Sequence, residues 1–146
     1  MPLQMTFGSK VTLVETTQRH PLGTFRVEGN KVYKYMKAGG TITANAGCMI
    51  SAAGTVLLTT GIGPGAGWNT TGVALASGDY FWMQVAGEWG PVDTNTGMTA
   101  VGYPVGVTDA DGVTLADPTT GVTAFANCTV AVKSETAGYI VLSGLI

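Results

Sequence analysis

The residues with the most reactive side chains are few and lie far apart in this chain. His20 is the only histidine, and Cys48 and Cys128 are the only cysteines. A nucleophilic triad or a zinc site needs a histidine or thiolates grouped with partner residues, and no such spacing occurs. We therefore expect no metal ion, no cofactor and no enzymatic activity, and we expect His20 to have a structural role.

The two cysteines are expected to be buried thiols rather than a disulfide. The N-terminal sequence lacks a basic stretch followed by an apolar one, which is the pattern of a secretory signal. Cysteines of proteins that are not exported usually stay reduced. Cys128 also falls on an alternating apolar face, between Ala126 and Val130.

Two acidic segments suggest weaker alternatives. The stretch TDADGVTLAD, with Asp109, Asp111 and Asp117, begins like a calcium-binding loop but lacks a third early ligand and the closing glutamate. We interpret it as a hairpin turn. Glu88, beside Trp89, is the one candidate acid for glycoside hydrolysis, which needs a carboxyl group of raised pKa in an apolar site. A position at the rim of the fold suits Glu88 better.

Aromatic residues are the strongest candidates for contact with a partner. Trp68, Trp82 and Trp89 flank segments rich in Gly and Thr. Such residues are typical of protein interfaces, but a place in the core suits them at least as well, and a sugar-binding platform is the weaker alternative. The candidate interface of the body comprises Arg26, Tyr33, Tyr35, Trp68, Trp82 and Trp89.

Charge is scarce and unevenly distributed. Charged residues make up 11% of the chain, against about 25% in a typical domain, and residues 38–78 contain none. Residues 1–37 hold six basic against two acidic residues, a balance of +4. The long uncharged stretch predicts an association surface. So few basic residues could neutralise only a few phosphates of a nucleic acid, which argues against a nucleic-acid partner. No apolar run is long enough to predict a membrane span.

The pattern of turns and alternation predicts an all-β fold, with a body formed by residues 23–146 as a single small β-sandwich or β-barrel-like domain. A hairpin is expected around a Gly29–Asn30 turn, with Val27 opposite Val32 and Phe25 opposite Lys34. Two short strands are expected within residues 47–60, on either side of Ala53–Gly54, and further strands are expected at 79–87, at 123–132 and at 138–146. The last of these is apolar on both faces, which predicts a central strand or one covered by another subunit.

Residues 1–22 are expected to form an extended N-terminal arm. An exposed apolar segment of this kind can add a strand to the sheet edge of a neighbour. The residues expected to contact a partner are Lys10, Val11, Leu13, Val14 and Arg19.

Two segments, HPLGTFRVEGNKVYKYMKAGG and GVALASGDYFWMQVAGE, together resemble capsid decoration (cement) proteins of tailed bacteriophages. The resemblance covers roughly residues 20–90 and implies a β-rich, usually homotrimeric structural protein on the outer surface of the virion capsid. The implied partners are the major capsid protein and further copies of the chain, with no enzyme and no cofactor. A phage tail or fibre component, and a carbohydrate-binding module using the tryptophans, are the alternatives.

Overall fold

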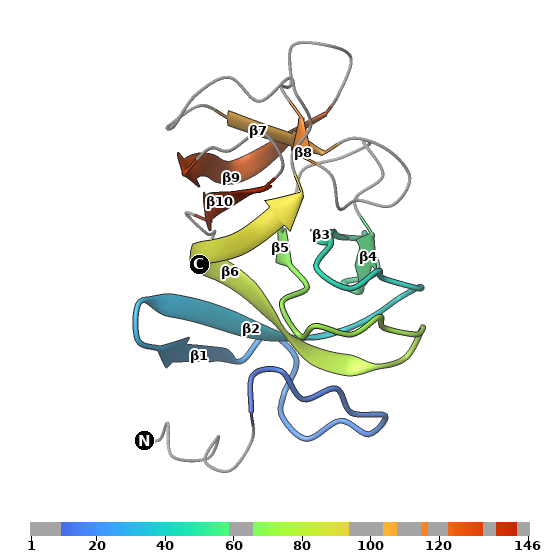
Figure 1. The fold of residues 1–146 in the computed structure, drawn as a ribbon. Coiled ribbons are helices and arrows are strands. Elements are labelled where there is room, and N and C mark those ends of the chain that lie inside the picture. Colours follow the sequence, from blue (N-terminus) through green and yellow to red (C-terminus); the bar gives the residue numbers. More distant parts are fainter. Residues whose placement is uncertain are drawn as a thin grey trace.

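The computed structural model describes residues 10–58, 66–93, 104–107, 115–116, 123–132 and 137–142, with side chains for 10–58 and 66–88. Every regular element within these ranges is a strand, which confirms the predicted all-β class (Figure 1). The strands are β1 (Phe25–Glu28), β2 (Lys31–Lys37), β3 (Gly47–Ile50), β4 (Val56–Leu58), β5 (Gly67–Trp68), β6 (Tyr80–Asp93), β7 (Pro104–Val107), β8 (Leu115–Ala116), β9 (Thr123–Val132) and β10 (Ala137–Leu142).

The first hairpin has the predicted register. Phe25 pairs with Lys34, and Val27 pairs with Val32. Gly29 has a φ of 59°. Asn30, the second central residue, does not have a positive φ, because Asn45 is the one non-glycine residue with positive φ in the described part of the chain. A single positive φ at the first central position identifies the turn as type II′, a geometry that matches the twist of the flanking strands.

Five strands form a closed circuit. β2 pairs with β6, β6 meets β5, β5 pairs with β3, and β3 pairs with β4. A parallel bridge between Ala38 and Val56 returns the circuit to the end of β2, and the Gly39 N–H donates to the Val56 carbonyl at 2.7 Å. Of the two predicted architectures, the described residues therefore form the barrel-like one, in which closure leaves few free edges.

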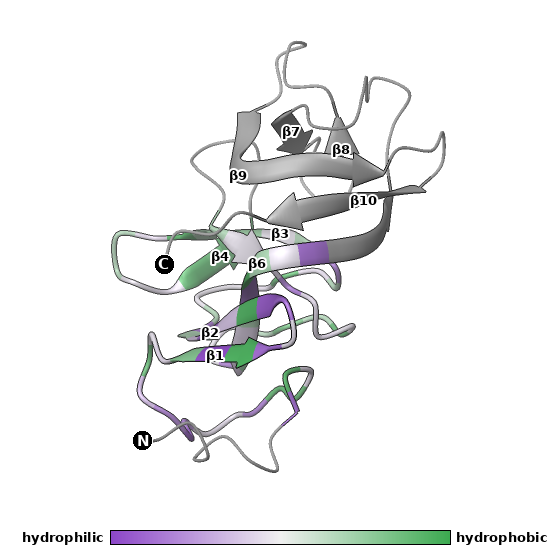
Figure 2. Ribbon diagram, turned by 90° about the vertical axis from the view of Figure 1, so that its left-hand side faces the viewer, coloured by the Kyte–Doolittle hydropathy of each residue, from purple (hydrophilic) through white to green (hydrophobic). Residues whose placement is uncertain are grey.

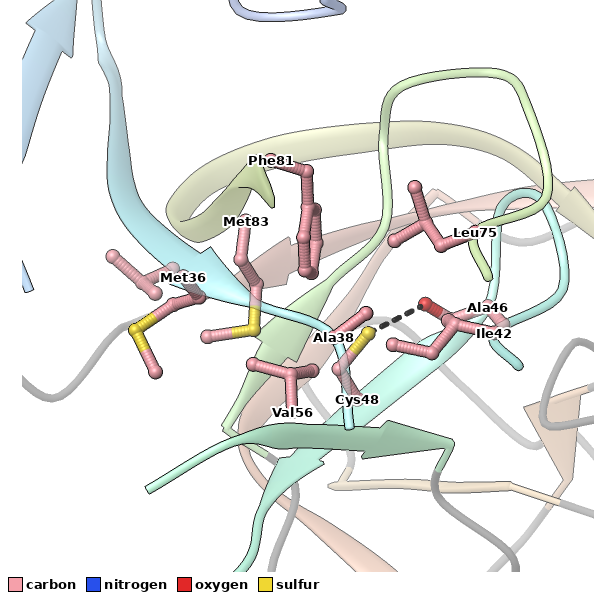
Figure 3. Packing of buried hydrophobic residues seen from close by; sticks show 10 residues of the cluster. Met36, Ala38, Ile42, Ala46, Cys48, Val56, Leu75, Phe81 and Met83 are labelled. Atoms are coloured by element: carbon pink, nitrogen blue, oxygen red, sulfur yellow. Dashed lines mark hydrogen bonds between the residues drawn. The ribbon is translucent and has the colours of Figure 1, made fainter. Parts of the chain in front are cut away.

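The interior of this small barrel holds the main hydrophobic core. Phe81, Met83 and Val85 point inward from β6, as their alternation predicted, because successive side chains of a strand face opposite sides. Figure 3 shows these side chains converging with those of the other strands and loops. The cluster comprises Met36, Ala38, Ile42, Ala46, Cys48, Val56, Leu75, Phe81, Met83 and Val85.

β6 bends where it leaves the barrel. The register with β2 shifts between Val32 and Tyr33, which marks a β-bulge. Gly87 follows with a φ of 98°, and a Cβ at this position would lie 2.7 Å from the Asn30 carbonyl oxygen. Only glycine tolerates both conditions. From Gly87 onward β6 pairs with β10, so one long strand serves both groups of strands.

The second group continues the sheet in the order β6, β10, β9, β7, β8 (Figure 1). β10 lies between β6 and β9, which confirms the central position predicted from its apolar sequence. The side chains of Trp89 and Cys128 lie outside the described part of these strands. Asp109, Asp111 and Asp117 also fall outside the described residues.

Residues 10–22, the strap, form no regular strand and lie against the body. Glu15 and Tyr80 form an isolated antiparallel bridge, with N···O distances of 3.0 Å and 2.7 Å. Val14 packs against the barrel core, and Val11 packs against aromatic residues on the outer face of the barrel. Residues 10–22 of the expected arm therefore cover their own chain, and residues 1–9 lie outside the described residues.

Candidate functional site

Beneath the strap lies a cluster of large aromatic side chains. Tyr33 and Tyr35 of β2 and Trp82 of β6 are buried, with exposures of 5%, 1% and 1%. They point away from the barrel core because they alternate with the inward-facing residues of the same strands. The rings of Tyr35 and Trp82 lie 5.0 Å apart, and Tyr80 stacks on Tyr35.

His20 inserts its ring into this cluster. Its centroid lies 5.0 Å from that of Tyr35, in a T-shaped arrangement, and 5.3 Å from that of Trp82. Its Nε2 atom is buried and has no hydrogen-bond partner among the described residues. The open depression beside it is lined by residues 18–21. These contacts give the imidazole a packing function and bring no nucleophile to it.

The Tyr35 hydroxyl links the strap to the cluster. It accepts a hydrogen bond from the Arg19 N–H at 3.1 Å and donates one to Glu15 Oε2 at 3.4 Å. Glu15 Oε1 in turn lies 3.2 Å from Arg19 Nε. Burial is the main cause that raises the pKa of Tyr35, so the hydroxyl keeps its proton and can donate. Two residues predicted to contact a partner, Arg19 and Tyr35, thus contact each other.

The candidate interface aromatics with described side chains are all buried in this chain. Trp68 is fully buried and donates from Nε1 to the Asn45 carbonyl at 2.6 Å. Trp82, Tyr33 and Tyr35 form one buried cluster on the outer face of β2 and β6, against which Val11 of the strap packs. These four residues therefore belong to the core and offer no surface to a protein or a sugar, which corrects their assignment as interface residues.

Arg26 closes the edge of the aromatic cluster. Its guanidinium carbon lies 5.7 Å from the centre of the Trp82 ring, and its side chain is only 13% exposed. It also forms an ion pair with Glu28 on the same strand. Arg26 therefore lies mostly within the body, with only its edge exposed.

The candidate residues of the strap divide into two sets. Val11 and Val14 face the body. Lys10 is exposed, Leu13 is 44% exposed, and the Arg19 side chain is 65% exposed. The outward set could meet a partner while the strap stays in place.

The uncharged stretch forms a surface of its own. Ile42 and Leu75 pair through two backbone hydrogen bonds of 3.0 Å and 2.8 Å, and both side chains are buried. Antiparallel pairing sets the residues beside them next to each other on two adjoining loops. The exposed members form the uncharged loop patch: Thr41, Thr43, Val73, Ala74 and Ala76.

A buried amide fixes the two loops of this patch. Asn69 is fully buried, and its Nδ2 donates to the carbonyls of Thr43 at 3.1 Å and Val73 at 3.0 Å. Its Oδ1 accepts from the backbone and the hydroxyl of Thr71. Because every polar atom of the amide is used, the patch has a defined shape.

Most charged side chains lie away from the uncharged loop patch, but Asp79 borders it, since its Oδ2 accepts a hydrogen bond from the Ala76 N–H at 2.9 Å. Every charged side chain in the described part of the chain belongs to the strap, β1, β2, β6 or Asp79, which directly precedes β6. Figure 2 shows the hydrophilic colouring on β1 and β2, whereas the loops near β3 and β4 are pale or hydrophobic. Glu88, the weak candidate acid, is exposed at the edge of the charged part.

Neither the site chemistry nor the comparisons assign this chain to a known group. No family model, curated protein or solved structure matches it. Within the described ranges, no group of three or more His, Cys, Asp or Glu residues could hold a metal ion. In the same part of the chain, no helix is long and apolar enough to cross a membrane.

The uncharged stretch was noticed in the sequence, but the residues of the patch were not singled out. The sequence feature that marks these residues is a large apolar residue between two small ones, in Thr41-Ile42-Thr43 and in Ala74-Leu75-Ala76, where Ile42 and Leu75 are buried. Each alternation is only three residues long, which is too short to predict pairing without the fold.

Proposed function

We propose that this chain is a structural protein of a phage head that binds the outer capsid surface and stabilises the shell. The observation that carries the proposal is the uncharged loop patch, which is held on a closed β body and contains no charged side chain of its own. The resemblance in residues 20–90 supplies the kind of partner, the major capsid protein.

The physics of such a contact suits the patch. Burying charged groups at an interface costs several kcal/mol per ion unless each is well paired, and Thr, Ala and Val avoid that cost. The Asn69 hydrogen bonds hold the loops before binding, so little conformational entropy is lost on docking. A protein that binds only the assembled lattice stabilises it by mass action.

The strap provides a second, charged contact in this proposal. Lys10 and Arg19 are exposed on the strap, where they can meet acidic groups of the shell. A phage tail or fibre component could use the same surfaces. The carbohydrate-binding alternative loses its support from Trp68 and Trp82, because both are buried.

Co-sedimentation with expanded capsids of the virus that encodes the chain tests this proposal. We expect saturable binding at a fixed number of copies per shell and a higher temperature of shell opening. Dissociated capsid protein serves as the control, because a decoration protein should prefer the lattice. Absence of the chain from pelleted capsids, or saturable binding to glycans instead, would overturn the proposal.

A further inference from the structure

β1 is an open edge of the sheet in the described part of the chain, where it pairs only with β2. The Tyr35 N–H donates to the Thr24 carbonyl at 2.8 Å and the Tyr35 carbonyl accepts from the Gly23 N–H at 2.8 Å, so the backbone groups of Tyr35 face the β1 side of β2. Hydrogen-bonded and non-hydrogen-bonded pairs alternate along an antiparallel ladder. Arg26 and Glu28 therefore bond to β2, whereas Phe25 and Val27 direct their N–H and C=O groups away from the sheet.

This edge lacks the usual protection against strand addition. Edge strands are commonly protected by charges that repel an incoming copy. Here the exposed centre is Val27, whose exposure is 65%. The residues on either side of it, Arg26 and Glu28, have opposite charges. When two copies of the segment Arg26-Val27-Glu28 lie antiparallel, the arginine of each copy is therefore opposite the glutamate of the other.

We propose that two copies of this chain associate by antiparallel pairing of β1 about a two-fold axis at Val27. Val27 then exchanges both backbone hydrogen bonds with Val27 of the partner subunit. Arg26 then lies opposite Glu28 of the partner subunit, and Glu28 lies opposite Arg26 of the partner subunit. Together with the Arg26–Glu28 ion pair within each chain, the four side chains alternate in charge around the axis. Opposite charges directly across two strands stabilise the pair.

Other two-fold registers of the same edge are less favourable. An axis at Arg26 sets two arginines against each other, and an axis at Glu28 sets two glutamates against each other. Like charges directly opposite are destabilising. A two-fold contact also closes at two copies, because the same surface is used by both subunits. This dimer is independent of capsid binding, and it differs from the trimer that the resemblance implies.

Sedimentation equilibrium of the full chain, up to about 1 mM, tests the pairing in the range of weak interfaces. We expect a monomer–dimer equilibrium that shifts toward monomer when salt is raised, because salt screens the exposed ion pairs. Amide exchange gives a register-specific measurement. The Val27 amide should become protected only as concentration rises, whereas the Arg26 amide, bonded to β2, should be protected at every concentration.

A proline substitution separates edge pairing from folding. Val27→Pro removes an N–H that faces away from β2, so the hairpin keeps its internal bonds, as prolines on natural sheet edges do. We expect this variant to weaken dimerisation at least tenfold. Val27→Thr, which keeps the N–H and a β-branched side chain, is the matched control and should dimerise like the unmodified chain.

Charge variants test the register itself. Glu28→Lys alone and Arg26→Glu alone should each remain monomeric, because each places like charges opposite each other. An equimolar mixture of the two should form a heterodimer. A chain that stays monomeric up to about 1 mM, forms a trimer as its first oligomer, or dimerises equally well as Val27→Pro contradicts the proposal. If Arg26→Glu does not fold, the comparison of Val27→Pro with Val27→Thr still tests whether β1 forms the dimer contact.

Discussion

Cys48 shows how completely the barrel interior excludes water. Its thiol is fully buried and free, and it donates a weak hydrogen bond to the Ala46 carbonyl at 3.6 Å (Figure 3). Burial raises the pKa of this thiol to about 12, from an ordinary value of 9.0. A thiolate is the reactive form of cysteine, so native Cys48 is chemically inert, as the sequence predicted.

The stability of the chain should therefore fall in mildly alkaline solution. The native state keeps the Cys48 proton while the unfolded chain begins to lose it near pH 9, so the contribution is fully present below pH 9 and is lost as pH rises toward 12. Between pH 9 and 10 the free energy of unfolding should drop by about 1 kcal/mol from this group. Urea titrations at both pH values measure the drop.

Cys48→Ala is the control for this effect. It should be less stable at every pH because of the cavity, but it should lack the Cys48 share of the slope. Tyr33 and Tyr35, whose pKa values are also raised mainly by burial, add to the slope as pH approaches 10, but they do so equally in both proteins. Equal slopes in the two proteins would show that the thiol is ionised or exposed in the native state.

At the residue scale, alternation predicted which side chains of β6 face together but not what covers each face. Phe81, Met83 and Val85 were correctly grouped. Trp82, on the other face, was left open among core, interface and sugar platform. Only the strap, which is more than 60 residues away in the sequence, decides that this face is buried. A local pattern carries no information on such a distant contact.

Among the described residues, few backbone hydrogen bonds join the strap to the body. One bridge at Glu15–Tyr80 and the Tyr35 hydroxyl join it to the body, together with the His20 ring and two valines. Elements with few bonds open at low free-energy cost. Removal of the hydroxyl should therefore loosen the strap before it affects the barrel.

Tyr35→Phe should make the strap more accessible to trypsin at Lys10 and Arg19 while the barrel remains folded. The substitution removes the acceptor of the Arg19 N–H and the donor to Glu15, so we expect a loss of about 0.5–1.5 kcal/mol. Limited proteolysis followed by mass spectrometry measures the cleavage rates at both sites.

Tyr33→Phe is the matched control, since it lies on the same face of β2 and no hydrogen bond joins its hydroxyl to the strap in the described part of the chain. Its cleavage rates should equal those of the unmodified protein. If Tyr35→Phe is cleaved no faster than this control, the strap is held by the aromatic packing alone.

Elements defined by local signals were predicted well, and those defined by long-range contacts were not. The first hairpin follows from two residues at its turn and a period of two, so even its register was correct. The apolar sequence on both faces of β10 predicted either a central strand or one covered by another subunit, and the pairing with β6 and β9 shows the first. The close approach of the distant Asn30 carbonyl to Gly87, where β6 leaves the barrel, excludes a side chain at that position, and no local pattern signals this contact.

On the scale of the whole molecule, most charged side chains lie away from the uncharged loop patch. The strap, β1, β2 and β6 hold the charged side chains of the described residues, together with Asp79, which borders the patch through its hydrogen bond to the Ala76 N–H. The two proposed contacts use different parts of this division. Self-pairing depends on charges at β1, whereas shell binding depends on neutral residues on the other part of the barrel.

Substitution of one exposed valine in each region should therefore affect one contact and leave the other unchanged. Val73, in the uncharged loop patch, is 49% exposed, and Val27, in β1, is 65% exposed. Val73→Lys places an unpaired cation in a surface that must lose water on docking. Even partial desolvation of that charge costs more than the about 1.4 kcal/mol that corresponds to a tenfold change in affinity. We expect Val73→Lys to weaken capsid co-sedimentation at least tenfold and to leave the monomer–dimer equilibrium unchanged.

Val27→Lys should weaken dimerisation and leave capsid binding unchanged, because two lysines would meet at the two-fold axis. Both positions are at the surface, so thermal melting of each variant should stay close to that of the unmodified chain. Equal loss of capsid binding in both variants would mean that self-pairing is required for decoration. Undiminished binding by Val73→Lys would remove the patch as the shell contact and leave the exposed cations of the strap as the surface to test.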